Sequence, residues 1–272
     1  MNPDLSRRRM LASAAALGTA ALAGCSTDAI GRDGSADETA PEPRPPDGTL
    51  AEAGWERFKT APVEEETTAD APLGREVTVT ASGTNYYYED ARLRRRVRER
   101  TFGAVDEPLR VFFAGKLALD PNLLGAPFDV GSERVLDVVQ RQAESSYERE
   151  LSEMGLEGFS LVEESTLDVA TGEEARLRRY ESTYPYDDYE VPVTENSTHT
   201  VEGGELRYGS LLALWERDDR VLVAGGSYPG ENYATTEQVD VMAGVTATVD
   251  IDLELAPDEY RADLRDLVAR VE

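Results

Sequence analysis

Three carboxylates occupy alternate positions near the C-terminus, Asp250, Asp252 and Glu254. They fall in the alternating segment 245–255, whose apolar residues face the other way. Hard cations such as calcium and magnesium prefer clustered oxygens, so these carboxylates are the candidate metal ligands. The D-x-D-x-D-G spacing of a calcium loop is absent, and an acidic solvent face is the alternative interpretation. We therefore predict no metal and no cofactor.

Nucleophilic catalysis through a serine, histidine and aspartate would have to use His199, the sole histidine. It lies in the polar segment 195–200, which predicts a surface loop. The G-x-S-x-G pattern around a nucleophile is missing. Gly203-Gly204 and Gly225-Gly226 are expected at turns or bulges and form no phosphate loop. No residue is predicted to be catalytic, and the protein is not expected to be an enzyme.

Tyrosines gather near the middle of the chain, where Tyr184, Tyr186 and Tyr189 are closely spaced. Exposed aromatic rings can form a platform for sugars or peptides. On strands, however, they more often pack against residues of neighbouring strands. The three tyrosines are the candidate ligand platform for an unknown protein or small molecule.

Six arginines lie between positions 92 and 100 of an otherwise acidic chain. The surrounding segment 89–101 is predicted to be a helix that ends before Gly103. One interpretation is a solvated helix whose arginines pair with nearby carboxylates. The other is contact with anionic lipid headgroups or an acidic partner.

The leading segment has the layout of an export signal, with basic, apolar and small residues in that order. Its apolar run, 10–23, is shorter than the ~20 residues that cross a bilayer. Residues 6–11 read Ser-Arg-Arg-Arg-Met-Leu and resemble the twin-arginine signal, S-R-R-x-F-L, with Arg7 and Arg8 as the arginine pair. The resemblance implies export of the protein already folded.

The run ends in Leu22, Ala23, Gly24 and Cys25, which is similar to the lipobox of exported lipoproteins. That resemblance implies cleavage before Cys25, the only cysteine, and a lipid on its sulfur. The expected location is the outer face of the cytoplasmic membrane, held by that lipid. Plain cleaved secretion, an uncleaved signal anchor and a buried structural cysteine are the alternatives.

The composition is strongly acidic, with 54 Asp and Glu against 28 Lys and Arg, a net charge of −26. Only two of the 28 basic residues are lysines, Lys59 and Lys116. The balance resembles that of proteins from extreme halophiles, in which salt screens repulsion between carboxylates. It argues against nucleic acid as a partner. Asn196, in an Asn-Ser-Thr sequon, is a candidate for glycosylation in an exported protein.

The pattern of elements predicts one α+β domain over residues 54–272, preceded by a disordered tether over 25–53 and the signal over 1–24. We expect six or seven mostly antiparallel strands, a long central helix over 132–154 and a C-terminal helix on one face. Segment 63–71, with three successive glutamates, is expected to be a surface loop. The element order is loosely similar to the PsbP-like fold, which would suggest an assembly factor for a membrane complex.

The predicted function is that of a membrane-anchored extracellular lipoprotein with a non-catalytic binding or envelope-structural domain. The chain also resembles uncharacterised lipoproteins of halophilic archaea in its leader and acidity. A hydrolase that uses carboxylates or a metal is the main alternative, and a cleft with converging carboxylates of raised pKa would favour it.

Overall fold

A computed structural model describes residues 47–71, 75–121, 124, 132–242 and 244–272. The predicted signal and lipidation residues, Arg7, Arg8, Leu22, Ala23, Gly24 and Cys25, lie outside this part of the chain. Within it, no helix combines the length and apolar character needed to cross a membrane.

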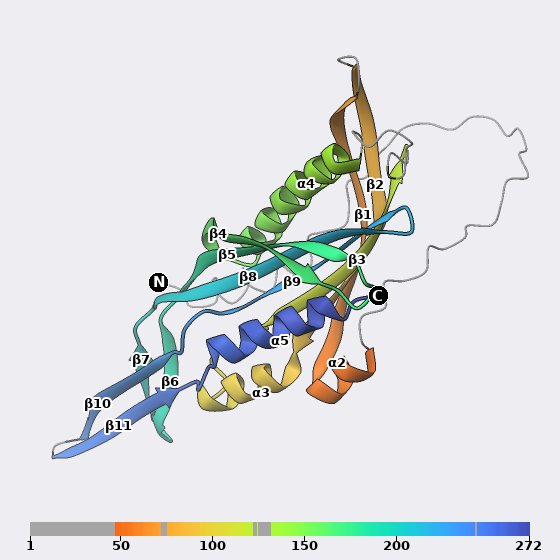
Figure 1. Ribbon diagram of the computed structural model, residues 1–272. Helices are drawn as coiled ribbons and strands as arrows, with labels where there is room; N and C mark the ends of the chain where they lie inside the picture. The colour runs from red at the N-terminus through yellow and green to blue at the C-terminus, as the bar shows by residue number, and fades with distance from the viewer. Residues whose placement is uncertain (1–46, 72–74, 122–123, 125–131, 243) are drawn as a thin grey trace, which may run out of the picture.

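The centre of the fold is an antiparallel sheet of seven strands in the order β1-β2-β3-β9-β8-β5-β4 (Figure 1). Its strands are β1 (Trp55–Ala71), β2 (Arg75–Asp90), β3 (Val111–Asp120), β4 (Glu157–Asp168), β5 (Glu174–Tyr186), β8 (Gly204–Arg217) and β9 (Arg220–Pro229). The middle strands β8 and β9 are apolar over most of their length because helices cover both sheet faces.

Helix α4 (Ser132–Glu153) covers one face of this sheet. The hydroxyl of Tyr147 donates to the Gly226 carbonyl at 2.7 Å, and its ring centroid lies 5.4 Å from that of Phe113. The opposite face carries α3 (Ala91–Arg100) and α5 (Pro257–Ala269). A Cβ on Gly226 would come within 3.0 Å of Leu264 on α5, so glycine allows that close approach. Gly225 and Gly226 thus lie within β9, and the turn or bulge expected there is wrong.

Two smaller hairpins project from one end of the sheet and lie together at the lower left of Figure 1. One is formed by β6 (Tyr189–Thr194) and β7 (Ser197–Val201), the other by β10 (Ala234–Met242) and β11 (Val245–Asp252). Val191, Val201 and Ile251 are buried although they belong to short strands. We call this pair of hairpins the arm.

The α+β class, the predominantly antiparallel sheet, the long central helix and the C-terminal helix are confirmed. The loop predicted for 63–71 is wrong, because these residues form the second half of the edge strand β1. Inward and outward positions alternate there, and Glu65 turns inward to accept a hydrogen bond from Gln142 on α4 at 3.0 Å. A polar contact, which hydrophobic periodicity does not detect, fixes that position.

The ordered domain also starts before the predicted boundary at residue 54. Helix α2 (Asp47–Ala53) buries Leu50, which is 1% exposed, in the main core. The tether predicted for 25–53 therefore overlaps a packed helix at its C-terminal end. A single apolar side chain in a short helix is too weak a pattern to reveal this from sequence.

Candidate functional site

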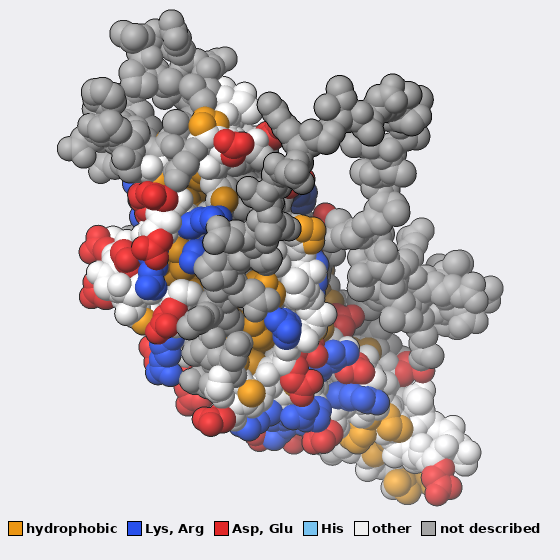
Figure 2. All heavy atoms as spheres, turned by 90° about the vertical axis from the view of Figure 1, so that its right-hand side faces the viewer, with side chains coloured by type: hydrophobic (Ala, Val, Ile, Leu, Met, Phe, Trp, Pro, Cys, Tyr) orange, Lys and Arg blue, Asp and Glu red, His pale blue; other side chains and the backbone are white. Residues whose placement is uncertain are grey.

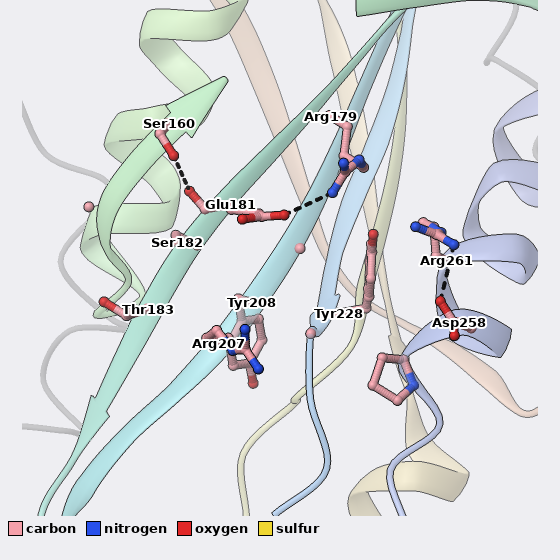
Figure 3. A pocket seen from close by; sticks show the side chains of 14 residues that line it. Ser160, Arg179, Glu181, Ser182, Thr183, Arg207, Tyr208, Tyr228, Asp258 and Arg261 are labelled. Carbon is pink, nitrogen blue, oxygen red and sulfur yellow. Dashed lines mark hydrogen bonds and ion pairs between the residues drawn. The ribbon is translucent and has the colours of Figure 1, made fainter. Parts of the chain in front are cut away.

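A groove of about 360 Å³ lies between β4, β5, β8 and β9 and the N-terminal turn of α5 (Figure 3). The sheet contributes polar and small residues to it, and α5 contributes Pro257, Asp258 and Arg261. Pro257 occupies the first turn of α5, where its missing N–H costs no helical hydrogen bond. The groove brings together residues from segments more than a hundred positions apart.

Tyr228 and Gly209 form the middle of the groove. A Cβ on Gly209 would lie 2.5 Å from Cζ of Tyr228, so only glycine leaves room for the ring over β8. Figure 3 shows the Tyr228 hydroxyl directed between Arg179 and Arg261. The phenol is thereby held against the sheet with its polar end towards two guanidinium groups.

Three arginines line the groove, each already paired with a carboxylate. Arg179 donates to Glu163 at 3.1 Å and to Glu181 at 3.0 Å. Arg261 donates to Asp258 at 3.1 Å within the first turns of α5.

The third arginine, Arg207, makes a two-part contact with Glu231 at the rim of the groove. Its Nε lies 2.8 Å from one carboxylate oxygen, and its backbone N–H donates to the other at 2.9 Å. That backbone hydrogen bond, followed by the guanidinium contact, lowers the pKa of Glu231.

The electrostatic setting of Tyr228 reflects both burial and charge. Burial raises the pKa of its hydroxyl, and the positive charges of Arg261 and Arg179 partly oppose that rise. The phenol therefore stays protonated at neutral pH and can donate a hydrogen bond beside two cations. This combination suits an anionic acceptor on a ligand.

The residues that line the groove can hold a ligand through hydrogen bonds. Guanidinium groups and a phenol donate hydrogen bonds, while Glu181 and Asp258 can accept them from a ligand's hydroxyl or ammonium groups. The volume falls within the range of small-molecule sites, about 300–1,000 Å³. Sequence reasoning missed this site, because its residues share no local spacing and meet only through the sheet order.

The predicted tyrosine platform is half-buried at the base of the arm. The Tyr184 hydroxyl donates to Glu107 at 2.8 Å, and the hydroxyls of Tyr189 and Tyr233 are 3.0 Å apart. Tyr186 meets the Tyr233 ring edge-on at 5.6 Å, and burial raises its pKa to about 12. The structure places these rings in packing contacts, and a ligand role for them stays a prediction.

The three candidate metal ligands have separate partners. Asp250 accepts from Thr236 at 2.9 Å, Asp252 accepts from Asn232 at 2.8 Å, and Glu254 pairs with Arg100 at 2.6 Å. In the described part of the chain, no three His, Cys, Asp or Glu side chains form a group that could hold a metal ion.

His199 lies on β7 and not in the loop predicted for it. Its Nε2 is 2.6 Å from Glu237 on β10, so the pair links the two hairpins of the arm. The turn that joins β6 to β7 leaves Asn196 exposed, as a glycosylation acceptor requires.

The arginine-rich segment is a helix, α3, as predicted. Its arginines contact surrounding acids and backbone: Arg94 bonds to Glu89 at 3.0 Å and to Asp106 at 2.9 Å. Arg96 donates to the Tyr260 hydroxyl at 2.7 Å. The interpretation of a solvated helix paired with carboxylates therefore accounts for its inner arginines.

One family model matches the whole of the described part of the chain. A family described as a domain of unknown function, DUF6517, matches residues 42–272. The chain belongs to that family. Comparison with curated proteins and with solved structures gives no match. The match begins at residue 42, before α2, in agreement with the burial of Leu50 in the core of this DUF6517 domain.

Proposed function

We propose that this DUF6517 protein is an exported, lipid-anchored binding protein without catalytic activity. Its ligand is a small polar molecule that bears an anionic group and binds in the groove beside Tyr228. The groove is the observation that carries the binding part of the proposal. The leader that ends in Cys25 supports the anchor and the location on the outer membrane face.

The ligand class follows from the charges around Tyr228. The groove holds Arg179, Arg207 and Arg261, and although four carboxylates (Glu163, Glu181, Glu231 and Asp258) pair with them, each guanidinium group keeps further N–H donors. An anionic ligand is repelled by most of this protein's surface but finds planar donors here. Because each arginine is already oriented by a carboxylate, little side-chain entropy is lost when the ligand binds.

The alternative of a carboxylate-based hydrolase predicts acids with a raised pKa in a cleft. The shifts found for Glu231 and Asp252 go the other way: hydrogen bonds from Arg207 and from Asn232, respectively, lower the two pKa values. A low pKa suits a fixed ion pair and not a proton donor. These two carboxylates, neither of which lines the groove, therefore give no support to a hydrolase, and the proposal of binding depends on the hydrogen-bond donors of the groove.

Groove binding is tested with the variant Arg179→Gln/Arg261→Gln and a panel of acetate, glutamate, inorganic phosphate and the neutral polyol glycerol. We expect at least one anionic compound to raise the Tm of the wild type by mass action and to lose this effect in the variant. The matched control, Arg141→Gln/Arg265→Gln, removes two exposed arginines outside the groove and should retain the shift. Equal shifts in all three proteins would contradict binding in the groove.

The anchor is tested separately by changing Cys25→Ser in the full chain. Loss of the protein from the membrane fraction is the expected result, since the lipid is attached to this sulfur. Retention of the variant in that fraction would reject the lipid anchor and leave groove binding unaffected.

A further inference from the structure

Phe102 has a backbone conformation and an exposure that its side chain does not explain. It follows Thr101, the C-cap residue of α3, at a φ of +53°, and is 61% exposed. Left-handed conformations are unfavourable for residues with a Cβ, and bulky residues rarely adopt them. The ring gains no compensating burial within the domain.

The local hydrogen bonds show that glycine would suit this position. The Gly103 N–H donates to the Arg98 carbonyl at 2.7 Å, and the Phe102 N–H donates to the Glu99 carbonyl at 3.3 Å. These two bonds form a Schellman helix end, whose left-handed residue is usually glycine. Phe102 occupies that place, and the chain supplies Gly103 only one position later.

The buried side chain of Thr101 holds the helix end in this conformation. Its buried hydroxyl donates to the Val97 carbonyl at 2.8 Å and accepts from the Val105 N–H at 3.1 Å. The turn is therefore held by the domain, and Phe102 is directed to solvent at a cost in stability. Such an outlier points to a function for the exposed ring.

Two arginines share the outward side of α3 with Phe102. Arg95 and Arg98 are three positions apart and lie on one side of α3, and Phe102 lies just beyond the C-terminal end of this helix, four positions after Arg98. Each side chain is 62% exposed, and the nearest carboxylates, Glu56 and Asp106, are 3.7 Å away, beyond hydrogen-bond distance. Both guanidinium groups can therefore contact an external anion.

The start of α3, a few residues before Arg95, lies next to the segment that leads back to Cys25. The Ala91 N–H donates to the Gly54 carbonyl at 3.1 Å, and Arg92 donates to the Glu52 carbonyl at 2.7 Å. The start of α3 is thus bonded to α2 and to the residue before β1. Figure 2 views the side where α2 lies and shows Lys and Arg interspersed with Asp and Glu along the lower rim.

We propose that Arg95, Arg98 and Phe102 form a membrane-docking surface that contacts anionic lipid headgroups. The guanidinium groups exchange their exposed ion pairs with Glu56 and Asp106 for contacts with lipid phosphates, and the ring enters the boundary between headgroups and acyl chains. Acidic residues elsewhere are repelled by such a membrane, which orients the domain. The lipid anchor proposed above would supply a high effective concentration, so a weak contact is sufficient.

The test places a fluorescent reporter at the ring. The full chain carrying Cys25→Ser and Phe102→Trp is mixed with brominated vesicles of either phosphatidylcholine alone or phosphatidylcholine with phosphatidylglycerol. We expect quenching of the new indole by the anionic vesicles, less by the neutral ones, and its loss after Arg95→Glu/Arg98→Glu. Because Cys25 is replaced, a failure of the lipid anchor does not affect this result.

Two matched variants act as controls. Met154→Trp introduces an indole at another exposed apolar position, after α4 on the opposite sheet face, and should not be quenched. Arg141→Glu/Arg149→Glu on α4 makes the same change in charge and should leave quenching at position 102 intact. Equal quenching of the indoles at positions 102 and 154, or none with either vesicle, would overturn the proposal; an acidic protein would then be the partner to seek.

A stability measurement tests the strain independently. Phe102→Gly should raise the Tm by about 2–4 °C, because glycine adopts the left-handed conformation without steric cost. Phe102→Ala removes the ring but keeps the strain and should give no such rise. A Phe102→Gly variant less stable than the wild type would show that the ring serves the fold, against a docking role.

Discussion

At the scale of single residues, Arg110 shows how this acidic domain uses a buried cation. Its side chain is 4% exposed and lies between the rings of Trp55 and Tyr260, 4.9 and 4.8 Å from their centroids. It contacts Asp90 and Asp263, each at 3.3 Å. Planar guanidinium suits this position because it can stack on rings and form hydrogen bonds at its edge.

Changing Arg110→Met should lower the free energy of unfolding by about 3–5 kcal/mol, because Asp90 then remains largely buried without its cation. Asp90 also caps α3 by accepting from the Leu93 N–H at 2.9 Å, so the damage extends to that helix. Denaturant unfolding measures the loss. As a control, Arg270→Met removes an exposed partner of Asp266 and should change stability by no more than about 0.5 kcal/mol. A loss of similar size in both variants would contradict the role given to Arg110.

The candidate site could not be predicted at this scale, and the reason is geometric. Gly209, Tyr228 and Arg261 carry no motif, and each is ordinary in its own segment. Only the pairing of β8 with β9 and the seating of α5 bring them together. The Arg-rich helix was predictable because six arginines in one segment form a local pattern. The left-handed conformation of Phe102 was not predictable, because the sequence does not reveal a backbone φ angle.

At the scale of elements, prediction worked where hydrophobic periodicity was strong. Helices α4 and α5 and strand β11 follow their apolar patterns closely. Prediction from sequence failed for β1, β6, β7 and β10, because these strands are short, polar or at an edge of a sheet. These strands are stabilised by pairing and by side-chain contacts such as Glu65 with Gln142, information that lies elsewhere in the chain.

Helix α2 gives the element-scale prediction. Leu50 is its main contact with the core, so Leu50→Ala should lower the free energy of unfolding by about 2–5 kcal/mol. Glu52→Ala, an exposed change in the same helix, should have little effect. Denaturant titration of both proteins provides the measurement. If Leu50→Ala is as stable as the wild type, α2 is not part of the cooperative domain and the boundary returns to residue 54.

At the scale of the whole molecule, net charge opposes compactness. The net charge is −26, and many of the acids lie at exposed positions such as Glu64, Glu66 and Glu190. Salt weakens both repulsion among these acids and attraction within surface ion pairs. Exposed pairs contribute only about 0–1 kcal/mol each, whereas repulsion acts among all the uncompensated charges. Relief of repulsion should therefore be the larger effect.

The protein should accordingly become more stable as NaCl rises from 0.1 to 1 M, over which the Debye length falls from about 10 to 3 Å. Urea unfolding at each salt concentration measures this. Sucrose at equal osmolality separates screening from solute exclusion, because it stabilises without screening charge.

The variant Glu64→Gln/Glu66→Gln/Glu190→Gln reduces the net charge from −26 to −23 and should gain stability at low salt while responding less to added NaCl. A wild type destabilised by NaCl would mean that ion pairs outweigh repulsion, and the salt-adapted interpretation of the composition would then be wrong.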